Sequence, residues 1–343
     1  MQTKKAKNST KPVIILIMAA VFAVLPFAAK AQNVATREHI PARKSITIKS
    51  LKEEITYLCD DLFEGRGAGT DGCAQAALYL QKEFGKIGLL KLANSYISPI
   101  SLGNGKTGRN VVGMLPGSQD SSCNKYVIVG AHYDNLGTLD GRVYPGADSN
   151  ISGVSSMLNL ARMMTIMRNL GRVHKSNVIF VAFDGREYSM AGSYGLWKLI
   201  ENGALTDPQS GQKITRDKIA LMVNIDQIGC SLSPLKSKRK DYMIMLGSES
   251  LKPSQKDMLN RCNRDYAIDM DIDLTYYGSE RFTEMFYRLS DQRVFVDKGI
   301  PSVLFTSGIT MNTNKTRDTE DTIDYEILQK RIYLMYHWLD KML

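Results

Sequence analysis

Two short apolar runs in the middle of the chain flank a stretch whose apolar residues recur at helical intervals. Both runs, residues 126–131 and 178–183, are rich in β-branched residues and are bounded by glycine or polar residues, as buried strands are. Between them, residues 151–167 carry apolar side chains at helical spacing, namely Val154, Met157, Leu158, Ala161 and Met164. The order of strand, helix and strand predicts a βαβ unit and therefore a sheet that is at least partly parallel.

Similar patterns extend in both directions from this unit. Further strands are predicted at residues 110–115, 219–225, 242–246 and 302–306. Further helices are predicted at residues 51–62, 73–88, 191–202 and 325–343, with one or two more between residues 250 and 290. No repeat or low-complexity tract marks a domain boundary. We therefore expect one α/β domain over residues 32–343, with a mixed, largely parallel sheet flanked by helices.

Local signals define some of the boundaries and loops. Thr70 or Asp71 is expected to cap the helix at residues 73–88, and Gly88 is expected to end it. Residues 32–50 are mixed and polar, which predicts a loose lead-in to the domain. Residues 231–240 are basic and polar, which predicts a solvated loop.

The first 31 residues have the pattern of a secretory signal peptide. Lysines precede an apolar run at residues 13–29, and Ala29-Lys30-Ala31 fits the small-x-small cleavage pattern. The alternative is a retained membrane anchor, but the run has about 17 residues and contains Pro26, which is at the short limit for a membrane span. We expect cleavage after residue 31 and an exported protein, periplasmic or extracellular, that is not held in the membrane.

The net charge of +9 does not indicate a nucleic-acid partner. Five lysines lie in the first 31 residues, which contain no acid, so the remainder carries +4 and has no long basic run. The five cysteines lack a CxxC motif and are odd in number, so at least one thiol is expected to stay free. We interpret all of them as structural: Cys59, Cys73, Cys123, Cys230 and Cys262.

Polar side chains gather where the predicted strands end. His132 and Asp134 follow the first strand of the βαβ unit, and Glu187 follows the second. Asp226 ends the strand at residues 219–225, and Asp148 precedes the central helix. Open α/β sheets bind ligands at the carboxyl ends of their strands, so these residues form the candidate site.

A series of ordered motifs connects the chain to a known family. The motifs are LxxxxxEGRGxGTxG at residues 58–72, NVVGxLPG at 110–117, GAHYD at 130–134, GADSNISG at 146–153, FDGREYSMAGS at 183–193, NIDQIG at 224–229, SDQRVF at 290–295, GIPSVLFTSG at 299–308 and TRDTEDTID at 316–324. With these motifs in this order, the chain resembles the aminopeptidase Y/S type zinc exopeptidases, a family that includes glutaminyl cyclases and glutamate carboxypeptidases. The resemblance runs from about residue 58 to residue 324.

The resemblance implies a two-zinc site with a bridging carboxylate and an activated water. Carried over by position, His132, Glu187 and Asp226 match metal ligands, and Asp134 matches the catalytic residue that orients the His132 imidazole. Asp148 is either a further metal ligand or the cap of the helix that follows it. The implied ligand is a peptide or an aminoacyl compound.

Four family positions are substituted in this chain. Ser149 stands where the bridging carboxylate is expected, and Arg186 stands where the general-base glutamate is expected. Arg317 replaces the second histidine ligand, and Gln292 replaces a histidine in the SDH motif. The other histidines of the chain, His39, His174 and His337, lie at positions that do not replace the missing ligand.

These substitutions predict an incomplete metal site. Serine is a poor bridging ligand, and arginine keeps its charge at any ordinary pH. We expect zero or one zinc ion rather than two, and a weak or inactive peptidase that still binds peptides. Two alternatives stay open: an active amide hydrolase with a rearranged metal site, and a non-catalytic interaction protein on the same fold. The sequence leaves the substrate and the oligomeric state open.

Overall fold

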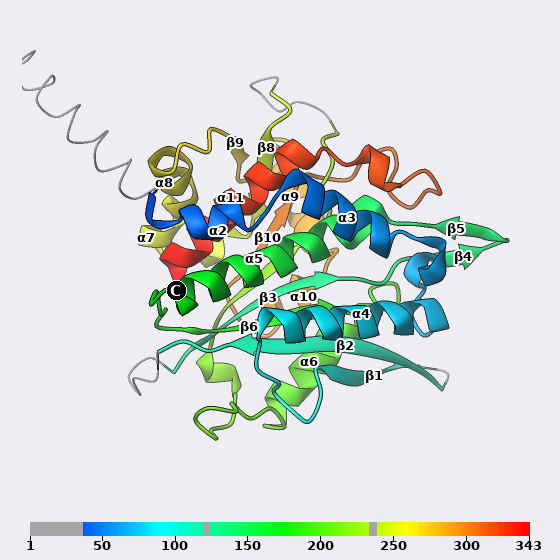
Figure 1. The fold of residues 1–343 in the computed structure, drawn as a ribbon, viewed down its shortest axis with the longest axis horizontal. Coiled ribbons are helices and arrows are strands. Elements are labelled where there is room, and N and C mark those ends of the chain that lie inside the picture. The colour runs from blue at the N-terminus through cyan, green and yellow to red at the C-terminus, as the bar shows by residue number, and fades with distance from the viewer. Residues whose placement is uncertain (1–36, 104, 119–123, 233–238) are drawn as a thin grey trace, which may run out of the picture. The chain divides into compact units, whose positions relative to one another are not determined.

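An eight-stranded sheet is the centre of the computed structural model, which describes residues 37–103, 105–118, 124–232 and 239–343 (Figure 1). Its strand order is β1-β2-β6-β3-β7-β10-β8-β9. The bounds are Ile97–Gly103 for β1, Lys106–Leu115 for β2, Asn177–Phe183 for β6, Tyr126–His132 for β3, Ile219–Ile225 for β7, Ser302–Thr306 for β10, Tyr242–Leu246 for β8 and Asp271–Asp273 for β9. The predicted signal peptide, residues 1–31, lies outside the described residues, as do Cys123 and most of the basic loop.

The centre of the sheet is parallel and its first edge is antiparallel. Strand β3 runs parallel to both of its neighbours, β6 and β7, and β7 runs parallel to β10. The pairs β1–β2, β2–β6 and β10–β8 are antiparallel, and β8–β9 is parallel. The prediction of a mixed, largely parallel α/β sheet is therefore confirmed. A separate two-stranded hairpin joins β4, Gly137–Leu139, to β5, Arg142–Tyr144.

Helices cover both faces of the sheet within the unit formed by residues 41–343 (Figure 1). Helix α5 (Ser152–Asn169) contacts β3, β6 and β7, and it also contacts α3 (Ile48–Leu58), α4 (Asp71–Ile87) and α11 (Tyr325–Met342). On the other face, α6 (Ala191–Glu201) contacts β1 and β2, and α10 (Gln292–Val296) contacts β7 and β10. The described part of the chain also contains α2 (Ile40–Lys44), α7 (Pro253–Lys256), α8 (Met258–Asp265) and α9 (Glu280–Tyr287).

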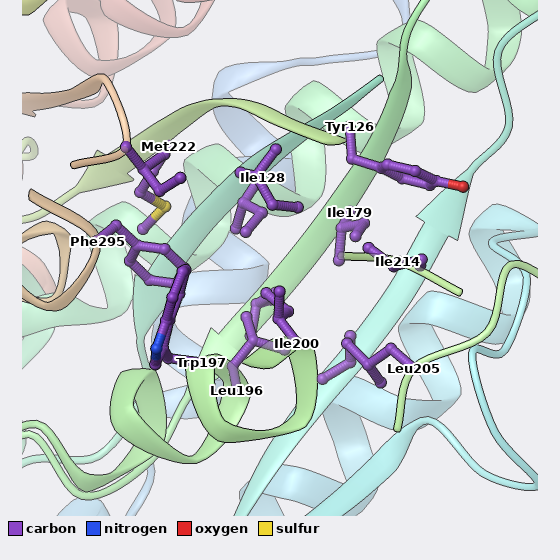
Figure 2. Close-up of a cluster of buried hydrophobic side chains, with 14 of the residues drawn as sticks. Tyr126, Ile128, Ile179, Leu196, Trp197, Ile200, Leu205, Ile214, Met222 and Phe295 are labelled. Atoms are coloured by element: carbon purple, nitrogen blue, oxygen red, sulfur yellow. The ribbon is translucent and has the colours of Figure 1, made fainter. Parts of the chain in front are cut away.

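One hydrophobic core lies between the sheet and α6. Figure 2 shows Ile128 and Ile179, on the central strands, pointing toward Leu196 and Ile200 of α6. Trp197 meets the Phe295 ring of α10 edge to face, with 6.0 Å between the ring centroids. This packing fixes the strand ends from which the polar site residues project.

Most predicted helices and strands are present, although some of them begin or end at other residues than predicted. Strands β7, β8 and β10 have the predicted bounds, and the Thr70 hydroxyl accepts a hydrogen bond from the Cys73 N–H to cap α4 as expected. Residues 40–44 and 48–50, predicted as a loose lead-in, are helical. The helix predicted at residues 51–62 ends at Leu58, and a 3-10 segment with Glu64 and Gly65 at positive φ follows it. Among the described residues, no helix is long and apolar enough to cross a membrane.

Candidate functional site

His132 and Asp226 meet at the carboxyl edge of the sheet. His132 is the last residue of β3, and Asp226 directly follows β7, the parallel neighbour of β3. Because parallel neighbours end at the same edge, the two side chains lie together, with 3.3 Å between His132 Nε2 and Asp226 Oδ1. Both residues are buried.

Backbone and hydroxyl groups fix the orientation of this pair. His132 Nδ1 lies 3.0 Å from the backbone carbonyl oxygen of Asp134 and 3.8 Å from its Oδ1 atom. The Ser290 hydroxyl donates to Asp226 Oδ2 at 2.5 Å. The expected orienting residue therefore holds the imidazole mainly through its main chain. Sequence reasoning gave Ser290 no role, although it lies in the SDQRVF motif.

Arg186 lies against the same carboxylate. Its Nε atom is 3.6 Å from Asp226 Oδ2, and its Nη1 atom is 3.8 Å from Glu187 Oε1. Its backbone N–H donates to Asp134 Oδ2 at 2.8 Å, which anchors the turn after β6. The structure thus brings together His132, Glu187 and Asp226 around Arg186, although the Glu187 side chain is 45% exposed.

Asp148 holds a loop and does not cap the central helix. Its Oδ1 atom accepts hydrogen bonds from the Gly229 N–H at 2.7 Å and from the Ser152 hydroxyl at 2.9 Å. In the first turn of α5 the Gly153 N–H donates to Asn150 Oδ1 and not to Asp148, so the helix-cap alternative for Asp148 is wrong. Asp318 accepts from the backbone N–H groups of Asp148 and Ser149, at 2.9 and 3.1 Å. The metal-ligand role of Asp148 stays a prediction.

Two other substituted positions have partners of their own. Arg317 is exposed, and its Nη2 atom donates to the Met311 carbonyl oxygen at 2.8 Å. Gln292 is buried and accepts a hydrogen bond from Asn224 Nδ2 at 2.8 Å. Of the other histidines, His174 Nε2 lies 3.0 Å from Asp340, near the C-terminal end of α11. Arg186 is therefore the substituted residue that contacts the predicted ligands.

The charges at the site are mutually compensated. Burial disfavours ionisation of Asp226, but His132, Arg186 and the Ser290 hydroxyl outweigh it and hold the pKa of Asp226 well below its usual range. Burial alone would lower the pKa of His132, but the contact with Asp226 outweighs burial and raises this pKa. Burial and the nearby Asp184 carboxylate raise the pKa of Asp134 well above its usual range. Asp226 is thus the firmly ionised acid at the sheet edge.

Arg66 is the residue that sequence reasoning left without a role. Its fully buried guanidinium donates to the carbonyl oxygens of Leu58 at 2.6 Å, Tyr133 at 2.8 Å and Gly146 at 3.1 Å. These carbonyls belong to the end of α3, the turn that follows β3 and carries Asp134, and the loop before α5. The EGRG motif was the signal in the sequence that could have indicated this role. An arginine between glycines is consistent with a side chain that donates hydrogen bonds to the carbonyl groups of several loops.

A small pocket of about 50 Å³ opens beside this cluster. Its polar part is formed by Arg186, Asp226, Gln227, Ser290 and Thr306. Its apolar part is formed by residues of β10, α9 and the adjoining loops, including Tyr276, Phe286, Leu289 and Ile309. The cluster therefore faces a recess that combines one cation, one carboxylate and an apolar wall.

Comparison with known proteins connects this geometry to a family. The family model "Peptidase family M28" matches residues 110–339, about two thirds of the chain. The chain belongs to peptidase family M28. The matched region of this M28 member includes every strand-end residue of the cluster and confirms the family resemblance seen in the motifs.

Individual relatives of this M28 chain differ in kind. A protein described as a probable zinc metalloprotease from Pyrenophora tritici-repentis is 31% identical over 124 residues, which cover 35% of this chain and 24% of that protein. The BOS complex subunit ncln of Danio rerio is 29% identical over 178 residues, 50% of this chain and 30% of that protein. The matches thus span about a quarter to a third of the length of these relatives.

The fold of the M28 chain matches solved structures. The LapA aminopeptidase of Legionella pneumophila superposes with a TM-score of 0.66 at 17% identity, covering 89% of this chain and 74% of that one. At this identity the likeness establishes the shared fold. It agrees with the mixed sheet and the helices on both of its faces.

Zinc is the metal implied by these names and by the motifs, and the described residues do not fit a zinc pair. The ligand atoms of one tetrahedral zinc lie roughly 3.4 Å from each other. The distance of 3.3 Å between His132 Nε2 and Asp226 Oδ1 therefore suits either two ligands of one ion or a direct hydrogen bond. A catalytic zinc needs about three protein ligands. Among the described residues, no group of three or more His, Cys, Asp or Glu side chains is arranged to hold a metal.

Arg186 is the physical reason for this misfit. Its Nε atom is 3.6 Å from Asp226 Oδ2, close to where an ion bound to that carboxylate would lie. At roughly 4 Å and an effective dielectric constant of about 20, a dication and a guanidinium repel each other by about 8 kcal/mol. The second carboxylate within reach, Glu187, pairs with the same guanidinium.

Proposed function

We propose that this chain is an exported M28-family protein that binds peptides or aminoacyl compounds in its sheet-edge pocket and hydrolyses them weakly or not at all. The observation that carries the proposal is the position of Arg186, which contacts Asp226 and Glu187 at the sheet edge. In this account the guanidinium supplies the positive charge that a metal would supply beside these carboxylates. The chain then keeps the architecture of the family site without its reactive centre.

The chemistry of the residues present supports the absence of efficient hydrolysis. Metal-assisted amide hydrolysis needs an activated water and a base that takes its proton, and the base contributes about 10²–10⁴-fold in rate. Arg186 cannot act as a base because it does not lose its proton. Asp134 is buried and already accepts the Arg186 N–H, so it is held away from that task.

The retained parts support binding. The His132–Asp226 pair is oriented by Ser290 and by the Asp134 carbonyl, and Arg66 holds the loops that carry it. These contacts hold the buried pair in one orientation and keep the pocket in one shape. A peptide that offers polar backbone groups and one apolar side chain suits this pocket.

A second candidate is a non-catalytic subunit of a larger assembly. It is favoured by the similarity to the BOS complex subunit ncln of Danio rerio, which covers half of this chain. Exposed apolar side chains on and after α9 are consistent with a partner surface, namely Phe282, Met285 and Leu289. A working zinc-dependent amide hydrolase is the third possibility, and it requires ligands beyond those that the described residues assemble.

The proposal is tested by measuring binding and turnover in the same preparation. Turnover of a panel of aminoacyl p-nitroanilides is followed with and without added zinc, and binding of unblocked tripeptides is followed by calorimetry. We expect binding without significant turnover, and we expect His132→Ala to leave the low turnover unchanged. Robust hydrolysis that is abolished by a chelator and by His132→Ala would contradict the proposal. If no peptide of the panel binds, the interaction-protein alternative replaces it.

A further inference from the structure

Arg186 has more hydrogen-bonding capacity than its surroundings use. A guanidinium carries five N–H donors in a planar fork. Among the described residues, no hydrogen bond is made by the Arg186 side chain, and its two ion-pair distances of 3.6 and 3.8 Å are longer than hydrogen bonds. Its Nε atom is fully buried and has no hydrogen-bond partner. A buried charged donor without a partner is costly, which indicates that an acceptor is supplied from outside.

Burial alone would lower the pKa of Arg186, but four carboxylates raise it, those of Asp226, Asp291, Glu187 and Asp134. Asp226 faces the His132 imidazole with Oδ1 at 3.3 Å and the Ser290 hydroxyl with Oδ2 at 2.5 Å. Glu187 is 45% exposed, so water screens its charge. These charges compensate that of Arg186, but among the described residues none of them accepts a hydrogen bond from its guanidinium, so its N–H donors stay open to an acceptor that enters the pocket.

The pocket has the chemistry of a site for an amphipathic ligand end. Arg186 lies at its polar side, and Tyr276, Phe286, Leu289 and Ile309 form its apolar wall. Its volume of about 50 Å³ suits one small apolar group rather than a long chain. A carboxylate and an apolar side chain on the same carbon atom match this arrangement.

We propose that Arg186 binds the C-terminal carboxylate of a peptide, with the apolar side chain of the last residue against the pocket wall. Arginine and carboxylate form paired, parallel hydrogen bonds, which gives the contact both strength and direction. This assignment depends on the peptide binding proposed above and adds to it which end of the peptide the chain recognises. It gives Arg186 a binding role in the position where the family motif has a base.

The experiment compares two ligands that differ only at the C-terminus. Binding of the tripeptide Ala-Ala-Leu with a free carboxylate and of its C-terminal amide is measured by calorimetry with the full chain. We expect the acid to bind roughly tenfold to a hundredfold more tightly than the amide. This is the gain in affinity that charge-assisted hydrogen bonds to a carboxylate typically provide. Arg186→Gln should abolish this preference, and Arg186→Lys should keep part of it, because lysine retains the charge without the fork.

The matched control is Arg317→Gln. It removes the other substituted arginine, which is exposed and bonded to the Met311 carbonyl, and it should leave the preference unchanged. Equal binding of acid and amide to the unaltered protein overturns the carboxylate assignment and leaves the proposed peptide binding intact. Persistence of the preference in a folded Arg186→Gln variant also overturns it. Absence of binding by both ligands and by every other peptide overturns the assignment and the proposed function together.

Discussion

Replacing Arg66 with methionine tests how the loops of the site are held. The Arg66 guanidinium is fully buried and donates to three backbone carbonyl oxygens, those of Leu58, Tyr133 and Gly146. Methionine replaces the aliphatic part of the arginine side chain and has no donor, so Arg66→Met leaves these carbonyls without their partner. Burial lowers the pKa of Arg66, which shows that holding this cation in the interior is itself costly.

The expected loss of stability follows from these contacts. Each buried acceptor left without a partner costs about 1–3 kcal/mol. The variant no longer has to bury the charge of Arg66, and water can enter part of the space that the guanidinium leaves. Both effects reduce the loss, so we expect a net loss of about 3–5 kcal/mol in the free energy of unfolding. Each kcal/mol corresponds to roughly 2–4 °C in Tm for domains of about 150–250 residues, so Tm should fall by roughly 6–20 °C.

Urea unfolding followed by circular dichroism measures this loss, with Arg317→Met as the control at an exposed arginine. The control should change the free energy of unfolding by less than about 0.5 kcal/mol. A loss below about 1 kcal/mol for Arg66→Met would refute the reasoning, because three buried carbonyls would then have found other partners. The loss of stability for Arg66→Lys should lie between those of the control and Arg66→Met, since lysine can donate to one or two of the three carbonyl oxygens.

Two further changes test contacts elsewhere in the domain. Asp340 forms ion pairs with Arg172 and His174. Burial opposes ionisation of Asp340, but these partners outweigh it and lower the pKa of Asp340. Asp340→Asn should therefore lower the free energy of unfolding by about 2–4 kcal/mol at pH 7. A carboxylate whose pKa is lowered by folding stabilises the folded state above the ordinary carboxyl pKa and loses this effect as the pH falls. The difference between Asp340→Asn and the unaltered protein should therefore shrink below about pH 4, which urea unfolding at several pH values measures. Gly72→Ala should destabilise by about 1–3 kcal/mol in the same assay, since its Cβ would lie 2.2 Å from the Phe63 carbonyl oxygen. Gly85→Ala, on the same helix with its nearest contact at 3.9 Å, should stabilise instead.

The central strands and helices could be predicted because their patterns are strong. Strands β7, β8 and β10 are short apolar runs buried along most of their length, so their ends are marked by the change to polar residues. Strand β1 was missed because it is an edge strand that contains Pro99 and buries only part of its residues, which weakens the alternation. The three-residue strand β9 is too short for any periodicity to be visible.

The site could be located from sequence, but the directions of its side chains could not. His132 and Asp226 were found because residues that follow parallel strands meet at one edge. The position of Asp148 depends on the loop before α5, where Ser149 and Asn150 leave helical geometry, and no local signal predicts that. Arg186 and Arg317 have equally long and flexible side chains, but the fold places Arg186 beside Asp226, forty residues away in sequence, whereas Arg317 bonds to Met311 in its own loop.

The zinc content of the purified protein tests most directly whether Arg186 takes the place of a metal. After dialysis against metal-free buffer, elemental analysis should find less than one zinc per chain in the unaltered protein, because about three ligands are needed and the described residues bring fewer together. In the triple variant Ser149→Asp, Arg186→Glu, Arg317→His, the zinc content should rise, since the change removes the cation beside Asp226 and adds three donors. Two tightly bound zinc ions per chain in the unaltered protein would contradict the account.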